Sequence, residues 1–154
     1  MDKKDLIEEL KKQTPVPGLD PEIFDILRGL VPMVALELFV TRTEGGFGLK
    51  KKKVGDVEGW SLPGGFIGMN ESFEKACERI AQRELGIKVT DLKFLNVFNW
   101  PEGSDRPARG HAVTLLFSCI AQEASDHIAY FRQIPKDTLP HHRTMLETGL
   151  KLVN

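Results

Sequence analysis

The sequence predicts an α/β or α+β fold, with a mixed β-sheet between helices. Segments with strand character alternate along the chain with segments of helical spacing, which is the pattern of a layered fold. The chain has 154 residues, of which 41% are hydrophobic and 28% are charged. These values are ordinary for one globular domain with its own core. We therefore expect a single domain over residues 1–154.

The N-terminal part of this domain is expected to be helical. Apolar residues at helical spacing predict a first helix over residues 2–12. Asp20 and Pro21 form the N-cap and first turn of a second helix, which ends at Pro32. Residues 1–30 are therefore expected to form a helical segment that precedes the sheet.

The rest of the chain interleaves strands with helices. Apolar density marks the strands, and proline and glycine mark the breaks between elements. The predicted strands cover residues 33–40, 47–53, 60–62, 93–98 and 111–121, with a loop or short strand at 126–132. Polar loops are expected at 54–59 and 99–110, and helices at 71–85 and 138–153, where His141 and His142 would cap or solvate the last helix.

Composition narrows the classes of function. The net charge is -1, from 21 basic and 22 acidic residues, so no broad basic surface for nucleic acid or an anionic membrane is expected. Any anion site must be local. The two cysteines, Cys77 and Cys119, lie in apolar stretches and are expected to be buried free thiols. No signal peptide or membrane-spanning segment is expected, which favours a cytoplasmic location.

A glycine pair followed by a helix carries the chemistry. Gly64 and Gly65 follow a strand, where the backbone can approach a ligand closely. The helix is expected to turn Phe73, Cys77, Ile80 and Ala81 toward the core. Glu84 lies one turn after Ile80, where a carboxylate is costly unless it is paired or bound to a cation such as Mg²⁺. The alternative is a glycine turn followed by a solvated helix.

This stretch, residues 62–87, resembles the Nudix box. The matching positions are Gly65, Glu71, Arg79, Glu84 and Gly86, at the spacing of that motif. The segments before the box resemble the first core strand of the family and its approach to the box. The resemblance implies the Nudix fold and a metal-dependent hydrolase that acts on a nucleoside diphosphate linked to another moiety.

The box also departs from its usual form. Ile80 and Arg83 stand where the family has glutamates, so that Glu84 is the one carboxylate left of the usual three. This altered box is similar to that of GDP-mannose mannosyl hydrolases, which hold one magnesium ion and cleave the sugar C1–O bond. The resemblance thus implies an Mg²⁺-dependent hydrolase of a nucleotide sugar, with Mn²⁺ as a substitute.

Roles follow from the resemblance residue by residue. Glu84, the Gly64 carbonyl and Asp126 would be metal ligands. Arg79 would orient the helix carboxylates or stabilise the departing diphosphate. Glu71 would have a structural role, tying the loop to the helix.

Two further residues are candidates for proton transfer. Glu37 stands alone in an apolar strand, where a buried carboxylate needs a partner or a task, although an edge position open to solvent would also explain it. His127 is the candidate general base, since its ordinary pKa suits proton transfer near neutrality. The alternative for His127 is a surface residue of a loop.

The substrate contacts leave the nucleotide open. Lys52 aligns with a basic residue that contacts diphosphate, whereas Phe66 stands where the mannosyl hydrolases have arginine. Trp100 could stack on a base or sugar, or anchor its loop. Arg109 belongs to a loop, 105–111, that resembles one in Nudix pyrophosphatases of ADP-ribose. The alternatives are therefore an ADP-ribose pyrophosphatase and a catalytically weak nucleotide-binding sensor; a homodimer is implied by resemblance only.

Overall fold

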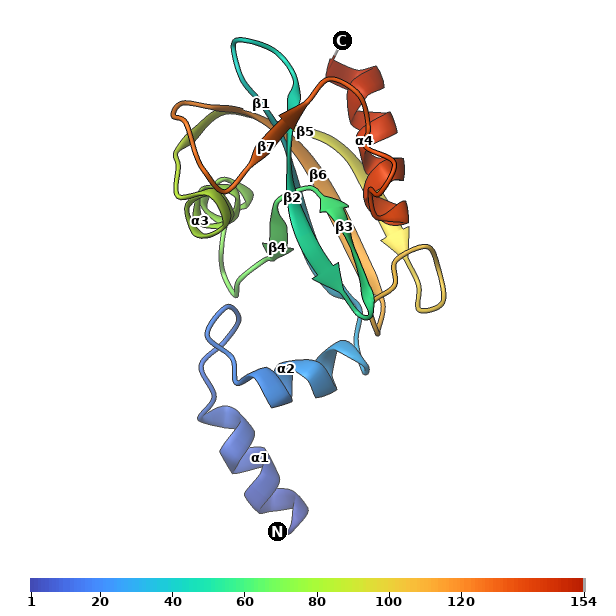
Figure 1. The fold of residues 1–154 in the computed structure, drawn as a ribbon. Helices are drawn as coiled ribbons and strands as arrows, with labels where there is room; N and C mark the ends of the chain where they lie inside the picture. Colours follow the sequence, from blue (N-terminus) through green and yellow to red (C-terminus); the bar gives the residue numbers. More distant parts are fainter. Residues whose placement is uncertain (154) are drawn as a thin grey trace.

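The computed structural model describes residues 1–153, which form four helices and seven strands (Figure 1). The helices are α1 (Lys3–Lys11), α2 (Pro21–Arg28), α3 (Phe73–Leu85) and α4 (Pro140–Val153). The strands are β1 (Met33–Thr41), β2 (Phe47–Val54), β3 (Val57–Ser61), β4 (Gly64–Phe66), β5 (Val89–Trp100), β6 (Ala112–Ala121) and β7 (Ala129–Phe131).

The strands form one mixed sheet. Its main path runs β3-β2-β1-β6-β5, with β4 paired to β1 and β7 paired to β2. The central pair, β1 and β6, is parallel over nine registered positions, and the other pairs are antiparallel. Strand β4 thereby places the glycine pair beside the middle of β1.

Two helices cover the two faces of this sheet. Because side chains alternate along a strand, β1 contributes to both sides of the core. Leu36 and Leu38 pack with Ile80 of α3, whereas Phe39 packs with Met145 of α4. Figure 1 shows α3 and α4 on opposite sides of the sheet. The predicted fold, a mixed sheet between helices, is confirmed.

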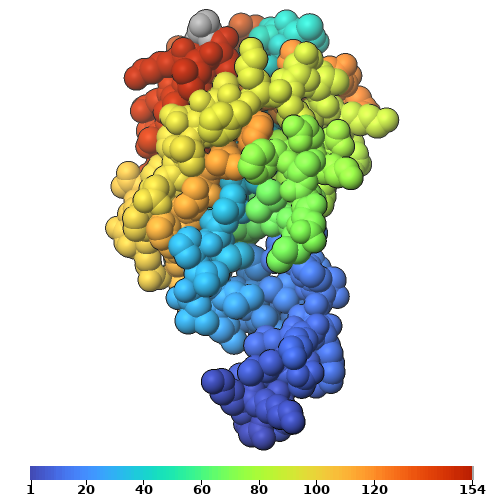
Figure 2. All heavy atoms as spheres, turned by 180° about the vertical axis from the view of Figure 1, so that it is seen from behind, coloured from blue at the N-terminus to red at the C-terminus, as the bar shows by residue number. Residues whose placement is uncertain are grey.

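The N-terminal helices extend away from the sheet. Asp2 caps α1 through a capping box, and Asp20 caps α2, which has proline in its first turn. Neither helix contains a buried residue. In Figures 1 and 2 they lie below the sheet, with α1 farthest from it. Within residues 1–153, no helix is both long and apolar enough to cross a membrane.

Several predicted boundaries were wrong. The polar loop expected at 54–59 is a tight hairpin, because Gly55 adopts a φ of 61° and lets Val54 pair with Val57. Helix α3 starts at Phe73 rather than at Glu71, with Ser72 as its N-cap. Strand β5 runs from Val89 to Trp100 and is longer than predicted, because its pairing with β6 continues across two register shifts.

Two burial predictions were also wrong. Phe73 was expected in the core but is 45% exposed, since it lies in the first turn of α3, where one side of its ring packs against the buried Phe117. His141 and His142 were expected to face solvent, yet both lie inside α4 and are buried. Cys77 and Cys119 are buried free thiols within the described residues, as predicted.

Candidate functional site

The glycine pair makes room for two charged side chains. Gly64 is registered opposite Glu37, where a Cβ would collide with the Glu37 carboxylate and the Leu36 carbonyl oxygen. A Cβ on Gly65 would collide with the guanidinium of Arg83. The absence of side chains at positions 64 and 65 is therefore what lets Glu37 and Arg83 converge on β4.

One oxygen of the Glu37 carboxyl group, Oε2, is buried without a hydrogen-bond partner among the described residues. Burial raises the pKa of Glu37 from its usual 4.5 to about 7; the charge of Lys52 opposes this rise and that of Glu84 adds to it. A carboxyl group with this pKa can take or give a proton near neutrality.

A cleft of about 260 Å³ opens beside Glu37. Glu37 is the acidic side chain among the described residues that line it, whereas the basic side chains come from three separate parts of the chain. Burial and the neighbouring charge of Arg28 lower the pKa of Arg106. Arg28 forms an ion pair with Asp25 at 2.9 Å, whereas Lys52, Lys53 and Arg106 form none with the described residues. Cationic groups held close together favour an anionic ligand. The ionisable lining residues are Arg28, Glu37, Lys52, Lys53, Arg106, His141 and His142.

Two histidines of α4 form a neutral wall of the cleft. Burial lowers the pKa of His141 to about 4 and also lowers that of His142. The backbone N–H of Leu62 donates to His142 Nδ1 at 3.1 Å, whereas His141 Nδ1 has no partner among residues 1–153. Trp100 packs edge-on against His141 and is buried, so its ring anchors the end of β5 instead of lying in a loop.

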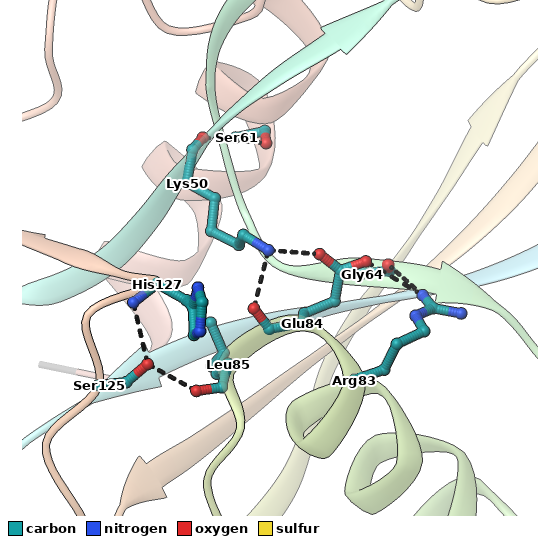
Figure 3. A network of polar contacts seen from close by, with 8 residues as sticks. All are labelled: Lys50, Ser61, Gly64, Arg83, Glu84, Leu85, Ser125 and His127. Carbon is teal, nitrogen blue, oxygen red and sulfur yellow. Dashed lines mark hydrogen bonds and ion pairs between the residues drawn. The ribbon is translucent and has the colours of Figure 1, made fainter.

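Glu84 lies next to this cleft and is held by Lys50 (Figure 3). Lys50 Nζ donates to Glu84 Oε2 at 2.8 Å and to the Glu84 carbonyl oxygen at 2.7 Å. Burial opposes ionisation of Glu84, but the hydrogen bond from Lys50 and the charges of Lys52, Lys50 and Arg83 together hold its pKa below the usual value. Glu84 is therefore an ionised carboxylate already paired with a cation.

Arg83 engages the second oxygen of the same carboxylate. Its Nη2 lies 3.1 Å from Glu84 Oε1 and 3.1 Å from the Gly64 carbonyl oxygen. The Glu84 carboxylate and the Gly64 carbonyl oxygen are two of the three expected metal ligands, and the third, Asp126, has an exposed side chain. Among the described residues there is also no group of three or more His, Cys, Asp or Glu side chains that could hold a metal ion. The donor set as folded does not fit a ready divalent-ion site.

Arg79 and Glu71 form a brace between the loop and α3. Arg79 Nε and Nη2 donate to the Glu71 carboxylate at 2.7 and 2.8 Å, and Nη2 also donates to the Phe66 carbonyl oxygen at 2.9 Å. Glu71 in turn accepts from the Gly68 backbone N–H at 2.8 Å. The contacts of Arg79 are thus made to the loop, and they support a positioning role.

The late loop meets α3 near Glu84 (Figure 3). Ser125 Oγ donates to the Leu85 carbonyl oxygen at 2.5 Å and accepts from the His127 backbone N–H at 3.1 Å. The side chains of Asp126 and His127 are exposed, and neither residue lines the cleft. The structure thus anchors this loop beside the site without bringing those two residues into it.

The remaining substrate candidates divide between the cleft and the surface. Lys52 and Phe66 line the cleft, and the Phe66 ring packs edge-on against Phe24 of α2. Arg109 lies outside the lining residues and forms an ion pair with Asp25 at 3.1 Å.

Sequence reasoning missed several residues of the site. Arg28, Lys50, Arg83, Arg106 and His141 come from five separate segments, and only the fold brings them together. One local signal was available. Arg79 and Arg83 are like charges four residues apart on α3, which is unfavourable for a helix unless both have partners elsewhere.

The comparisons with known proteins agree with this architecture. A family model described as a NUDIX domain matches residues 31–133. The low-salt glycan biosynthesis protein Agl8 of Haloferax volcanii is 33% identical over 85 residues, 54% of this chain and 54% of that protein. The ADP-ribose pyrophosphatase of Methanocaldococcus jannaschii is 30% identical over 88 residues, 57% of this chain and 50% of that protein. The chain thus spans about half the length of these relatives.

Solved structures share the fold. The NUDIX domain of Shewanella oneidensis NrtR, crystallised with ADP ribose, matches with a TM-score of 0.62 at 18% identity, covering 100% of both chains. Nudix hydrolases generally use divalent metal ions, although two of the three expected ligands, Glu84 and the Gly64 carbonyl, are engaged by side-chain cations here. Since the family model covers more than half of the sequence, the chain belongs to the NUDIX domain family.

Proposed function

We propose that this Nudix hydrolase acts on a nucleoside diphosphate linked to another moiety, with a nucleotide sugar of the GDP-mannose type as the favoured substrate. One observation carries the proposal. Basic side chains from α2, β2 and the loop after β5 converge on a cleft around the carboxyl group of Glu37. Such a cleft suits a ligand that brings its own negative charge.

Each basic residue has a role in this proposal. Lys52 and Arg106 bind the diphosphate oxygens and stabilise the negative charge that grows on them as the bond breaks. The positive charge of Arg28 disfavours the charged form of Arg106. The negative charge of a bound phosphate offsets this repulsion. Arg79 acts through the loop, as a positioning residue, because its contacts are made to Glu71 and Phe66.

The favoured reaction is hydrolysis of the glycosyl C–O bond. Glu37 accepts a proton from a water molecule, whose oxygen forms the new bond to the anomeric carbon. The bond from that carbon to the diphosphate oxygen breaks, and its electron pair leaves with the nucleoside diphosphate. The geometry favours Glu37 over His127 as the base, because Glu37 lines the cleft and His127 does not.

The resemblance implies Mg²⁺ for this reaction, with Mn²⁺ as a substitute. Glu84 and the Gly64 carbonyl would be its ligands, but these atoms are bound by Lys50 and Arg83, and Asp126 is exposed. A divalent ion would have to displace both cationic side chains. The proton transfer to Glu37 and the stabilisation of the diphosphate by Lys52 and Arg106 do not involve the metal.

Cleavage of ADP-ribose at phosphorus is a second candidate, and the position of Arg106 favours it. Arg106 enters the cleft from the loop at 105–111, which resembles that of ADP-ribose pyrophosphatases. One relative has that name, and the NrtR domain was crystallised with ADP ribose. In this reaction the same cleft would hold the diphosphate, and water would attack phosphorus.

A nucleotide-binding module with weak turnover is a third candidate. It is favoured by the engagement of Glu84 and the Gly64 carbonyl, since these two of the three expected metal ligands are already bound by cationic side chains. Binding of the panel nucleotides without release of any product would support this candidate over both hydrolases.

Isotope transfer distinguishes these candidates. The protein is incubated in oxygen-18 water with a panel of nucleotide sugars and ADP-ribose, once with Mg²⁺ and once with EDTA. Labelled free sugar together with unlabelled nucleoside diphosphate supports attack at carbon. Labelled monophosphates indicate attack at phosphorus.

Glu37→Gln should lower turnover at least a hundredfold. Glu78→Gln, on the exposed face of α3, should leave turnover unchanged. Equal turnover in both variants would refute Glu37 as the base.

A further inference from the structure

Arg83 lies between two oxygen atoms that were expected to bind a metal ion. Its Nη2 bridges the Gly64 carbonyl oxygen and Glu84 Oε1 at 3.1 Å each, as a small cation between two oxygen ligands would. Gly65 leaves the space that the guanidinium occupies. Arg83 stands at a position where the usual box has a carboxylate. The substitution therefore replaces a ligand for a cation by a cation.

Lys50 completes the same arrangement from β2. Its ammonium contacts Glu84 Oε2 and the Glu84 carbonyl oxygen. The Lys50 side chain is 22% exposed and that of Glu84 15%, so this pair is held in the wall of the site. Each oxygen of the Glu84 carboxylate thus has its own cationic partner, one from α3 and one from β2 (Figure 3).

Arg83 also retains donors for a ligand. Its side chain is 49% exposed, and its Nε and Nη1 groups donate no hydrogen bond to the described residues. A guanidinium presents a planar set of N–H donors that matches two phosphate oxygens. Arg83 does not line the cleft itself, but it is fixed to Gly64, which does, so that its free edge can meet an anion at the border of the cleft.

We infer that Arg83 and Lys50 take the place of the divalent ion, so that the site holds a diphosphate through side-chain cations and binds free Mn²⁺ or Mg²⁺ weakly. The identity of the anion rests on the proposed function, whereas the weak binding of metal does not. The substitution that tests this assignment is Arg83→Glu, which restores a carboxylate beside Glu84 and frees the Gly64 carbonyl. The matched control is Lys75→Glu, which makes the same change of charge on the exposed face of α3.

The first measurement is binding of Mn²⁺ alone, followed by the electron paramagnetic resonance signal of the free ion. Wild type and Lys75→Glu should bind Mn²⁺ equally weakly. Arg83→Glu should bind it at least about tenfold more tightly, because a repelling charge becomes an attracting one next to a dication. Circular dichroism verifies that each variant is folded. Tight Mn²⁺ binding by wild type, or no gain in folded Arg83→Glu, would overturn the inference.

The second measurement uses ADP as the probe, in EDTA, by isothermal titration calorimetry. Wild type should bind ADP without metal, Arg83→Lys should retain part of the affinity, and Arg83→Glu should lose at least about tenfold. Binding of ADP by wild type only when metal is added would overturn the inference. If wild type binds ADP under neither condition, the proposed function fails, and the Mn²⁺ measurement still decides the role of Arg83.

Discussion

Replacing Glu37 by glutamine should make the protein more stable at neutral and higher pH. The carboxyl group is held in a place where burial disfavours its ionised form, and Oε2 has no hydrogen-bond partner among the described residues. Glutamine has nearly the same shape and carries no charge. A stabilising substitution at a buried polar residue is typical of a group kept for activity rather than for folding.

The magnitude follows from the pKa of Glu37. A rise from 4.5 to about 7 costs roughly 3 kcal/mol of folding free energy once the group is ionised, at about 1.4 kcal/mol per tenfold change in equilibrium. Because the folded pKa is the higher one, the penalty is absent below pH 4.5, grows between pH 4.5 and 7, and is constant above. The gain from Glu37→Gln should therefore be close to zero at pH 4.5 and roughly 3 kcal/mol at pH 8.

Urea unfolding of wild type and Glu37→Gln at pH 4.5 and pH 8 tests this prediction. Glu78→Gln, on the exposed face of α3, is the matched control and should change the unfolding free energy by less than about 0.5 kcal/mol at either pH. If Glu37→Gln is destabilising at pH 8, or its effect does not depend on pH, then Glu37 is satisfied in the fold and the reasoning is wrong.

Three further predictions concern the frame of the site. Arg79→Ala should lower the unfolding free energy by roughly 2 kcal/mol, since it leaves the partly buried Glu71 carboxylate unpaired; a loss below about 0.5 kcal/mol in urea unfolding would contradict the brace. Gly65→Ala should fold normally, because only the flexible end of Arg83 must move, and it should weaken ADP binding. In Gly64→Ala the new methyl group would collide with a backbone oxygen, so this variant should have a markedly lower thermal midpoint. Burial lowers the pKa of His141 to about 4, so the stability that its neutral form contributes is present above pH 6.5 and is lost on acidification. Between pH 7 and pH 4.5, the unfolding free energy of wild type should fall by about 2 to 3 kcal/mol more than that of His141→Gln. Equal losses in urea unfolding would refute this prediction.

Local patterns were sufficient for most of the fold. The caps at Asp2 and Asp20, the apolar density of β1 and the glycine after α3 each act within a few residues, and the elements they predict are present. The hairpin between β2 and β3 was missed because its turn residues, Gly55 and Asp56, were read as part of a polar loop.

The site was harder to predict because its charges are assembled by long-range packing. Glu37 could be singled out, since an isolated carboxylate in an apolar strand is unusual at the level of sequence. Arg106 could not, because a loop arginine has no local feature that tells whether it enters a cleft. The burial of His141 and His142 depends on which face of α4 meets the sheet, and two adjacent polar residues leave that open.

The most direct test is a crystal structure of the protein grown with ADP-ribose and Mn²⁺, with an anomalous map to locate the ion. We expect the diphosphate against Lys52 and Arg106, with Arg83 still on the Gly64 carbonyl oxygen and no Mn²⁺ bound to Glu84. A Mn²⁺ ion between Glu84 and the Gly64 carbonyl, with Arg83 displaced, would contradict the replacement of the metal by side-chain cations.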